Sequence, residues 1–269
     1  MRQHHLSDLF PKICQLAGQA GKAVMQIYAD KAFADVVLEN KADDSPLTLA
    51  DMASNHTIVN GLTTLTPDIP VVSEEDTESL RFRTPKGCFW LIDPLDGTKE
   101  FLARNGEFTV NIALIEDGEP VWGVVDAPAL GELFWGGKDF GSFRQVESGT
   151  TSLFVSAPAQ SRQKLRVVAS KSHLNAETLA FIDRLGAVEL IQAGSSLKFC
   201  RIAEGKADVY PRLAPTCEWD TAAAQAVVEG AGGQVYDMQG ARLLYGKPDL
   251  LNPSFIASAV SLSQLEKIL

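Results

Sequence analysis

The sequence predicts a mixed α/β protein made of two αβ halves, residues 1–150 and residues 151–269. In the first half, apolar runs rich in β-branched and aromatic residues follow one another from Cys88 to Val146, separated by Gly, Asp and Pro. This pattern is typical of a meander of antiparallel strands. After about residue 155, strand-like and helix-like stretches alternate, which indicates a layered α/β arrangement. The chain of 269 residues is 45% hydrophobic, so it can bury a sizeable core.

The first half is expected to open with helices and continue as a large sheet. Apolar residues recur at helical spacing from Leu6 to Ile27, and Thr48 to Leu65 is predicted to form a second helix. A short strand is expected at Ile69–Val72. Further strands are expected at 88–92, 108–117, 120–127, 132–137 and 140–146.

In the second half, strands and helices are expected to alternate along the chain. Strands are predicted at 165–170, 188–193 and 207–211, and helices at 175–186, 195–205 and 221–232, before short strands and a C-terminal helix. We expect a binding site between the two halves, because pockets form preferentially at such interfaces.

Composition argues against several classes of function. The net charge of −10 disfavours binding to a nucleic acid polymer or to an anionic membrane. No apolar run approaches the roughly 20 residues of a membrane helix, so no integral membrane segment is expected. The N-terminal stretch lacks the apolar region and cleavage site of an export signal, which favours a cytoplasmic location. The cysteines are far apart, and we expect reduced, structural thiols.

Two aspartates end an apolar run in the stretch WLIDPLDGTKEF. Asp93 and Asp96 repel each other and lose hydration there unless a cation lies between them. Lys99 or an arginine is one candidate cation. However, Gly97 and Thr98 begin a predicted helix, whose first N–H groups can bind an anion. Hard oxygen ligands beside an anion site favour Mg²⁺, with substrate phosphate completing its coordination.

The other acidic candidates each have a structural alternative. Asp51 stands three residues after Thr48, as in a capping box. Glu74 and Glu75 follow a short strand and fit a solvated loop. Asp220 stands where a helix N-cap is expected. None of these residues establishes a site by itself.

Several other enzyme and binding motifs are excluded. The aspartate spacing in DPLDGTKEF differs from that of an EF-hand loop and from the D-x-D-x-T nucleophile of haloacid-dehalogenase-type phosphatases. The chain has neither a G-x-x-x-x-G-K-[ST] loop nor a G-x-S-x-G elbow, which argues against kinase-like and serine-hydrolase chemistry.

Four motifs in this order resemble the inositol monophosphatase superfamily of Mg²⁺-dependent, lithium-sensitive phosphatases. They are KADDSPLTLAD at 41–51, the acidic pair in VSEED, DPLDGT at 93–98 and WD at 219–220. The resemblance covers nearly the whole chain. Within the superfamily, DPLDGTKEF and the stretch from 194 to 225 are similar to bacterial 3'(2'),5'-bisphosphate nucleotidases of the CysQ type. Those enzymes remove the 3'-phosphate from adenosine 3',5'-bisphosphate, a by-product of sulfate activation and sulfonation.

The resemblance implies a five-layer αβαβα sandwich of the inositol monophosphatase and fructose-1,6-bisphosphatase type. It also implies two to three Mg²⁺ ions. Glu74, Asp93 and the carbonyl of Leu95 would hold the first ion, and Asp93, Asp96 and Asp220 the second. Glu74 and water would hold a third.

The same resemblance implies which residues act in catalysis. Asp51, Glu74 and Thr98 are the implied catalytic residues. Thr98, hydrogen-bonded to Asp51, would orient or deprotonate a water beside Glu74, and the N–H groups of Gly97 and Thr98 would bind the phosphate. The implied substrate contacts are Glu74, Leu95, Asp96, Gly97, Thr98, Asp220, Ser195, Ser196 and Lys198.

The residues that select the substrate are less specific in pattern. Ser195, Ser196 and Lys198 begin a predicted helix, and Lys206 and Arg212 follow it. Any of them could face a 5'-phosphate or the nucleoside. The structural alternative is a helix N-cap at Ser195 and solvated surface cations.

Three functions are therefore compared. The first is hydrolysis of the 3'-phosphate of adenosine 3',5'-bisphosphate, a small-molecule partner, by a metal-activated water. The second is an inositol monophosphatase or a fructose-1,6-bisphosphatase-like sugar phosphatase, since the metal motifs are shared. The third is a non-catalytic, metal-dependent sensor of phosphorylated metabolites. Some bacterial relatives associate peripherally with the inner membrane, which nothing in this acidic sequence requires.

Overall fold

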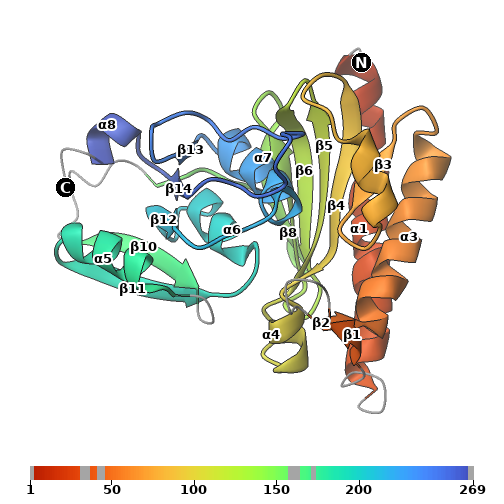
Figure 1. Cartoon of the computed structure of the whole chain (residues 1–269), viewed down its shortest axis with the longest axis horizontal. Coiled ribbons are helices and arrows are strands. Elements are labelled where there is room, and N and C mark those ends of the chain that lie inside the picture. Colours follow the sequence, from red (N-terminus) through yellow and green to blue (C-terminus); the bar gives the residue numbers. More distant parts are fainter. Residues whose placement is uncertain (1–2, 31–36, 41–45, 157–163, 171–173, 266–269) are drawn as a thin grey trace.

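The computed structural model describes residues 3–30, 37–40, 46–156, 164–170 and 174–265. Five layers alternate as αβαβα (Figure 1). This confirms the predicted fold class. The helices are α1 (Gln3–Ala29), α3 (Leu49–Leu65), α4 (Thr98–Leu102), α5 (Ala176–Arg184), α6 (Leu197–Ala203), α7 (Ala222–Gly230) and α8 (Leu262–Leu265), with the 3-10 helices η1 (Thr77–Phe82) and η3 (Glu218–Asp220).

The larger sheet has seven strands in chain order, from β3 to β9. Its first pair is parallel and the rest form the predicted antiparallel meander. The last strand, β9, was not predicted. The strands are β3 (Val71–Ser73), β4 (Cys88–Asp96), β5 (Thr109–Glu116), β6 (Glu119–Ala127), β7 (Glu132–Gly137), β8 (Gly141–Val146) and β9 (Gly149–Ser152).

Strand alternation decides which face each side chain of this sheet takes. On β4, Trp90 and Ile92 pack in the core cluster beneath α1 and α3. Phe89 and Leu91 point the other way, into the cluster that contains α6 and α7. A near-continuous apolar strand is what a sheet covered on both faces requires. In Figure 1, α1 and α3 lie along the outer face of this sheet.

The second sheet has five strands in the order β11-β10-β12-β14-β13. Its parallel part alternates with helices as predicted, while β12, β14 and β13 pair antiparallel. Its outer face packs against α5 and α8. The strands are β10 (Leu165–Ser170), β11 (Val188–Ala193), β12 (Val209–Arg212), β13 (Gln234–Asp237) and β14 (Phe255–Ser258).

The central layer joins the two halves of the chain. One buried cluster contains Phe89 and Val125 of the large sheet together with Val227 and Val228 of α7. The division into residues 1–150 and 151–269 stays a prediction. A separate two-stranded sheet, β1 (Val37–Asn40) with β2 (Pro46–Thr48), precedes α3.

Positions 41–45 of the first motif lie outside the described residues. Within the described residues, no helix combines the length and apolar character needed to cross a bilayer. All four cysteines are free thiols, as expected.

Candidate metal and phosphate site

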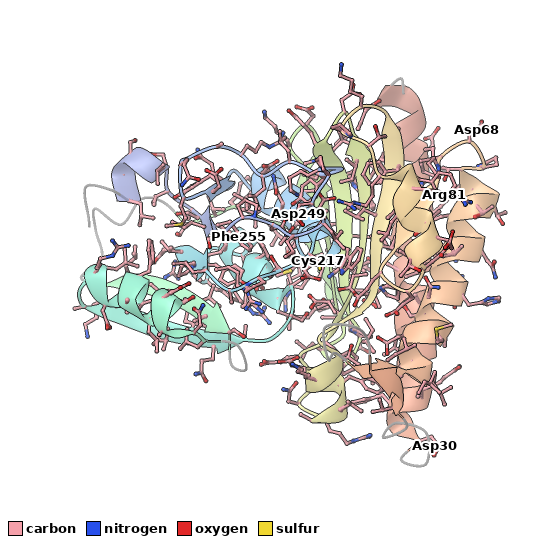
Figure 2. All side chains as sticks on the ribbon, in the orientation of Figure 1. Asp30, Asp68, Arg81, Cys217, Asp249 and Phe255 are labelled. Atoms are coloured by element: carbon pink, nitrogen blue, oxygen red, sulfur yellow. The ribbon has the colours of Figure 1, made fainter. Side chains whose placement is uncertain are left out.

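A pocket of about 380 Å³ lies where the two sheets approach each other, at the end of β4. Its lining residues come from two stretches of the chain, 74–100 and 170–255. Figure 2 labels two of these residues, Cys217 and Phe255, which lie near the middle of the molecule.

Three carboxylates from three separate segments meet in this pocket. One oxygen each of Glu74, Asp93 and Asp220 lies within 4.8 Å of the other two. Glu74 follows β3, and its N–H donates to the carbonyl of Ile92 on the parallel neighbour β4 at 3.2 Å. This pairing sets Glu74 beside Asp93, the next residue of β4. Asp220, the last residue of η3, comes from the second half of the chain.

The local backbone supports two of these carboxylates. Oδ1 of Asp93 accepts a hydrogen bond from the N–H of Leu95 at 3.0 Å, and Oδ2 of Asp220 accepts one from the N–H of Cys217 at 2.7 Å. Asp220 therefore closes the turn of η3 rather than capping α7, whose N-cap is Thr221.

Burial and neighbouring charge make the acid cluster unfavourable by itself. Burial, followed by the negative charges of Asp96 and Glu74, raises the pKa of Asp220 well above its usual value. A divalent cation among these oxygens would offset that repulsion. The donor set consists of hard carboxylate oxygens, which fits an ion such as Mg²⁺.

Asp96 lies in the same pocket but is held differently. Its Oδ2 accepts from Oγ of Ser196 at 2.8 Å and from the amide of Asn111 at 3.4 Å. Thr109 lies opposite Asp96 in the strand register. The sequence interpretation missed Thr109 and Asn111. Polar residues on the inward face of an otherwise apolar strand were the available signal.

Asp51 and Thr98 meet as the resemblance implied. The hydroxyl oxygen of Thr98 lies 3.3 Å from Oδ1 of Asp51 and 3.2 Å from the carbonyl oxygen of Leu95. Its single proton can be donated to one of them at a time. Oδ2 of Asp51 accepts from the N–H of Thr48 at 2.8 Å, completing the capping box of α3. The capping interpretation and the contact with Thr98 are both present.

Gly97 and Ser195 take unusual backbone conformations beside the cluster. Gly97 precedes α4 with φ of 89°, a region that favours glycine. A Cβ there would lie 3.1 Å from Cβ of Ser195, whose own φ is 47°. The Ser195 hydroxyl is 2.6 Å from that of Thr109. The close approach of these two loops brings the first and second halves of the chain together.

The predicted substrate residues separate into two groups. Lys198 lines the pocket with 6% exposure, and its Nζ donates to the carbonyl of Ser195 at 2.5 Å. Burial lowers the pKa of Lys198 to about 8. Arg212 also lines the pocket, whereas Lys206 pairs with Glu204 on the surface. Ser196 is the N-cap residue of α6 and is not a lining residue.

Aromatic residues of the second half complete the pocket. Phe199 of α6, Tyr210 of β12 and Phe255 of β14 line it together. The ring centroids of Phe199 and Tyr210 are 5.1 Å apart, and those of Phe199 and Phe255 are 5.6 Å apart. The sequence interpretation missed these rings, because inward-facing aromatic residues of strands and helices usually belong to the core.

Comparison with known proteins identifies the family. The sequence signature described as the inositol monophosphatase family matches residues 5–268. The chain belongs to this family. Members of the family depend on metal ions, in agreement with the acid cluster.

Individual relatives in the family extend this result. The 3'(2'),5'-bisphosphate nucleotidase CysQ of Shigella flexneri is 47% identical over 251 residues, which cover 93% of this chain and 99% of that protein. CysQ of Haemophilus influenzae is 33% identical and covers 92% of this chain and 91% of its own length. The crystal structure of CysQ from Bacteroides thetaiotaomicron has a TM-score of 0.82 at 40% identity, over 94% of this chain and 97% of its own. The relatives from Shigella flexneri and Haemophilus influenzae are both named as nucleotidases, a class of phosphatase.

Proposed function

We propose that the chain is a Mg²⁺-dependent 3'(2'),5'-bisphosphate nucleotidase that hydrolyses the 3'-phosphate of adenosine 3',5'-bisphosphate to AMP and phosphate. The identity to CysQ proteins supports the nucleotide substrate. One observation carries the proposal. The pocket combines an acid cluster with a buried lysine, Lys198, and an arginine, Arg212. The metal ions that the acid cluster would hold form one anion-binding feature, and Lys198 with Arg212 forms a second. Two such features in one pocket suit a substrate with two phosphate groups.

The oxygen donors around the cluster are proposed to hold two to three Mg²⁺ ions. Glu74, Asp93 and the carbonyl of Leu95 form one set, Asp93, Asp96 and Asp220 a second, and Glu74 with water a third. When bound, Mg²⁺ supplies a water of lowered pKa and polarises the phosphate oxygens.

The chain's own groups then orient the reacting atoms. The Thr98 hydroxyl, held by Asp51, is proposed to orient the attacking water beside Glu74. The N–H groups of Gly97 and Thr98, at the start of α4, are proposed to bind the phosphate. The first N–H groups of a helix have no intrahelical acceptor, so they are available to an anion. Positioning and electrostatics account for most of phosphoryl-transfer catalysis.

Recognition of the nucleotide is assigned to the second half of the chain. Lys198 and Arg212 are proposed to bind the 5'-phosphate, and Ser195 to contact the substrate. Ser196 acts through Asp96 and the carbonyl of Asp220, to which its hydroxyl can donate. A cytoplasmic location and peripheral membrane association stay predictions.

A panel of phosphate esters tests the substrate. We expect phosphate release from adenosine 3',5'-bisphosphate in the presence of Mg²⁺, with little release in EDTA. Inositol 1-phosphate and fructose 1,6-bisphosphate are expected to react more slowly. Faster hydrolysis of either sugar phosphate would favour the alternative activity within the family. No release from any ester at saturating Mg²⁺ would support a non-catalytic sensor.

A lysine variant tests the second anion-binding feature. Lys198→Met is expected to raise KM for adenosine 3',5'-bisphosphate by about tenfold or more, because a charged hydrogen bond contributes roughly 1.5–3 kcal/mol. KM for adenosine 3'-monophosphate, which lacks the 5'-phosphate, should change little. Lys206→Met is the control, since this lysine lies on the surface after the end of α6. Equal effects on both substrates would exclude contact with the 5'-phosphate.

A further inference from the structure

Glu218 is completely buried two residues before the site residue Asp220. Its exposure is 0%, and it is the first residue of η3. A buried carboxylate is strongly unfavourable unless charges or hydrogen bonds compensate it. Glu218 does not belong to the cluster of Glu74, Asp93 and Asp220, so the proposed metal site does not explain why this carboxylate is buried.

Four donors reach the carboxylate oxygens of Glu218. Oε2 accepts from Nε of Arg83 at 3.2 Å and from the N–H of Gly246 at 2.9 Å. Oε1 accepts from the N–H of Lys247 at 3.1 Å and from its Nζ at 2.5 Å. Two cations and two backbone groups therefore hold one carboxylate, and they come from two other segments of the chain.

These two segments also contact each other directly. Nη2 of Arg83 donates to the carbonyl of Lys247 at 2.7 Å. Gly246 lies so close to the backbone of Thr84 that a Cβ would be 2.3 Å from its carbonyl oxygen. Glu218, Arg83 and the 246–247 turn thus form one interlocked unit, called here the Glu218 clamp.

The Arg83 end of the clamp leads back to Glu74. Arg83 is the C-cap residue of η1, which begins three residues after Glu74. Two hydrogen bonds connect the end of β3, just before Glu74, to the start of η1. The N–H of Ser73 donates to Oγ of Ser79 at 3.0 Å, and the N–H of Asp76 donates to the carbonyl of Ser73 at 3.2 Å. The clamp therefore ties the segment that carries Glu74 to the turn that carries Asp220.

We propose that Glu218 is a positioning residue that holds Glu74 and Asp220 together before a metal ion binds. Repulsion among Glu74, Asp93 and Asp220 would otherwise separate the segments that carry them. The ion pairs of Glu218 with Arg83 and Lys247 oppose this separation, and these three residues do not line the pocket. This inference rests on the proposed metal site and deepens it.

Metal binding measured without substrate tests the clamp. Calorimetric titration with Mg²⁺ is compared for the wild type, Glu218→Gln, Arg83→Met and the double variant. We expect each single variant to weaken Mg²⁺ binding by about tenfold, in the range known for groups that orient metal ligands. The double variant should be no weaker than either single one, because both remove the same contact. At saturating Mg²⁺, kcat should return close to the wild-type value.

The control is Arg81→Met, on the same 3-10 helix. The Arg81 side chain is 68% exposed, lies 4.0 Å from the carboxylate of Glu78 and contacts the Phe82 ring. Mg²⁺ affinities of Arg83→Met and Glu218→Gln within twofold of the wild type would overturn the inference while leaving the metal site intact. A similar loss in Arg81→Met would also overturn it. If the wild type binds no Mg²⁺, the proposed function fails as well. Should Glu218→Gln not fold, Arg83→Met decides.

Discussion

At the scale of single residues, Asp51 illustrates how one carboxylate serves two purposes. Oδ2 accepts from the N–H and hydroxyl of Thr48, and Oδ1 lies 3.3 Å from the Thr98 hydroxyl. The two oxygens point to different partners. The structural and catalytic interpretations of Asp51 are therefore compatible, and a substitution can separate them.

Asp51→Asn is expected to lower kcat by about 100-fold or more while changing stability little. The side-chain oxygen of Asn can still accept the capping hydrogen bond, but the amide cannot serve as a base partner for Thr98. Thr48→Ala is the matched control, since it removes the cap and should cost about 1 kcal/mol of stability without this loss of kcat. Near-normal turnover in Asp51→Asn would contradict the catalytic assignment.

Asp126 gives a residue-scale prediction about pH. It is 7% exposed, and its Oδ2 lies against α1, where a Cβ on Gly21 would be 2.0 Å away. Burial raises the pKa of Asp126 from 3.8 to about 7. Between these values the folded protein binds a proton that the unfolded chain does not. The contribution of this group to stability is thus present at low pH and is lost as pH rises to about 7.

Asp126→Asn should therefore stabilise the protein more at pH 8 than at pH 5. The gain at pH 8 is at most roughly 4 kcal/mol, the free energy that corresponds to the difference between the two pKa values. Denaturant unfolding at both pH values measures it. Asp139→Asn, at an exposed position in the turn between β7 and β8, is the control. Equal effects of Asp126→Asn at both pH values would show that Asp126 titrates normally.

At the scale of elements, the contact between α7 and β6 connects packing with the site. Gly123 of β6 lies directly beneath Ala223 of α7, and a Cβ on Gly123 would be 2.4 Å from the Ala223 carbonyl oxygen. Asp220 lies just before α7. The position of this helix on the sheet therefore helps to set the position of a site carboxylate.

Gly123→Ala is expected to destabilise the protein by about 1–3 kcal/mol, as overpacking of a core typically does. Because α7 must move away from the sheet, kcat should fall as well. Gly18→Ala is the control, since a Cβ on this α1 glycine meets nothing within 4 Å. It should be neutral or stabilise α1 by up to about 1 kcal/mol. A Gly123→Ala enzyme with wild-type Tm and kcat would show that α7 does not sit as tightly as described.

At the scale of the whole molecule, the acid cluster joins both halves of the chain. Glu74 directly follows β3 and Asp93 belongs to β4 of the large sheet, whereas Asp220 lies between β12 and β13 of the second sheet in sequence. The central core also contains residues of both halves. A cation in the cluster should consequently stabilise the entire fold and not one half alone.

Mg²⁺ should raise the Tm in a concentration-dependent way. Binding to the folded state alone stabilises by about 2.7 kcal/mol at 100 times the Kd. Thermal unfolding with increasing Mg²⁺, at constant ionic strength, measures the effect. Asp220→Asn should remove most of it, because one of the three clustered carboxylates loses its charge. A Tm that does not respond to Mg²⁺ in the wild type would contradict the proposed metal site.

Much of this architecture could be predicted because local patterns are strong where both faces of an element are buried. The apolar runs of β4 and β5 and the capping box at Thr48 and Asp51 were visible in the sequence and are confirmed. The strand β9 was missed, since Gly149–Ser152 is exposed along its length and carries no apolar alternation.

The sequence by itself determined the chemistry of this protein: acids after apolar strands, in a spacing and order that identify the family. Only the tertiary structure decided which of them meet. Glu74, Asp93 and Asp220 converge, and Asp96 accepts a hydrogen bond from Ser196. Lys198 is buried in the pocket, while Lys206 is on the surface. Glu218 forms a salt bridge with Arg83. These contacts join residues as far apart as Glu74 and Asp220, and their geometry depends on how the layers pack, which no local pattern records.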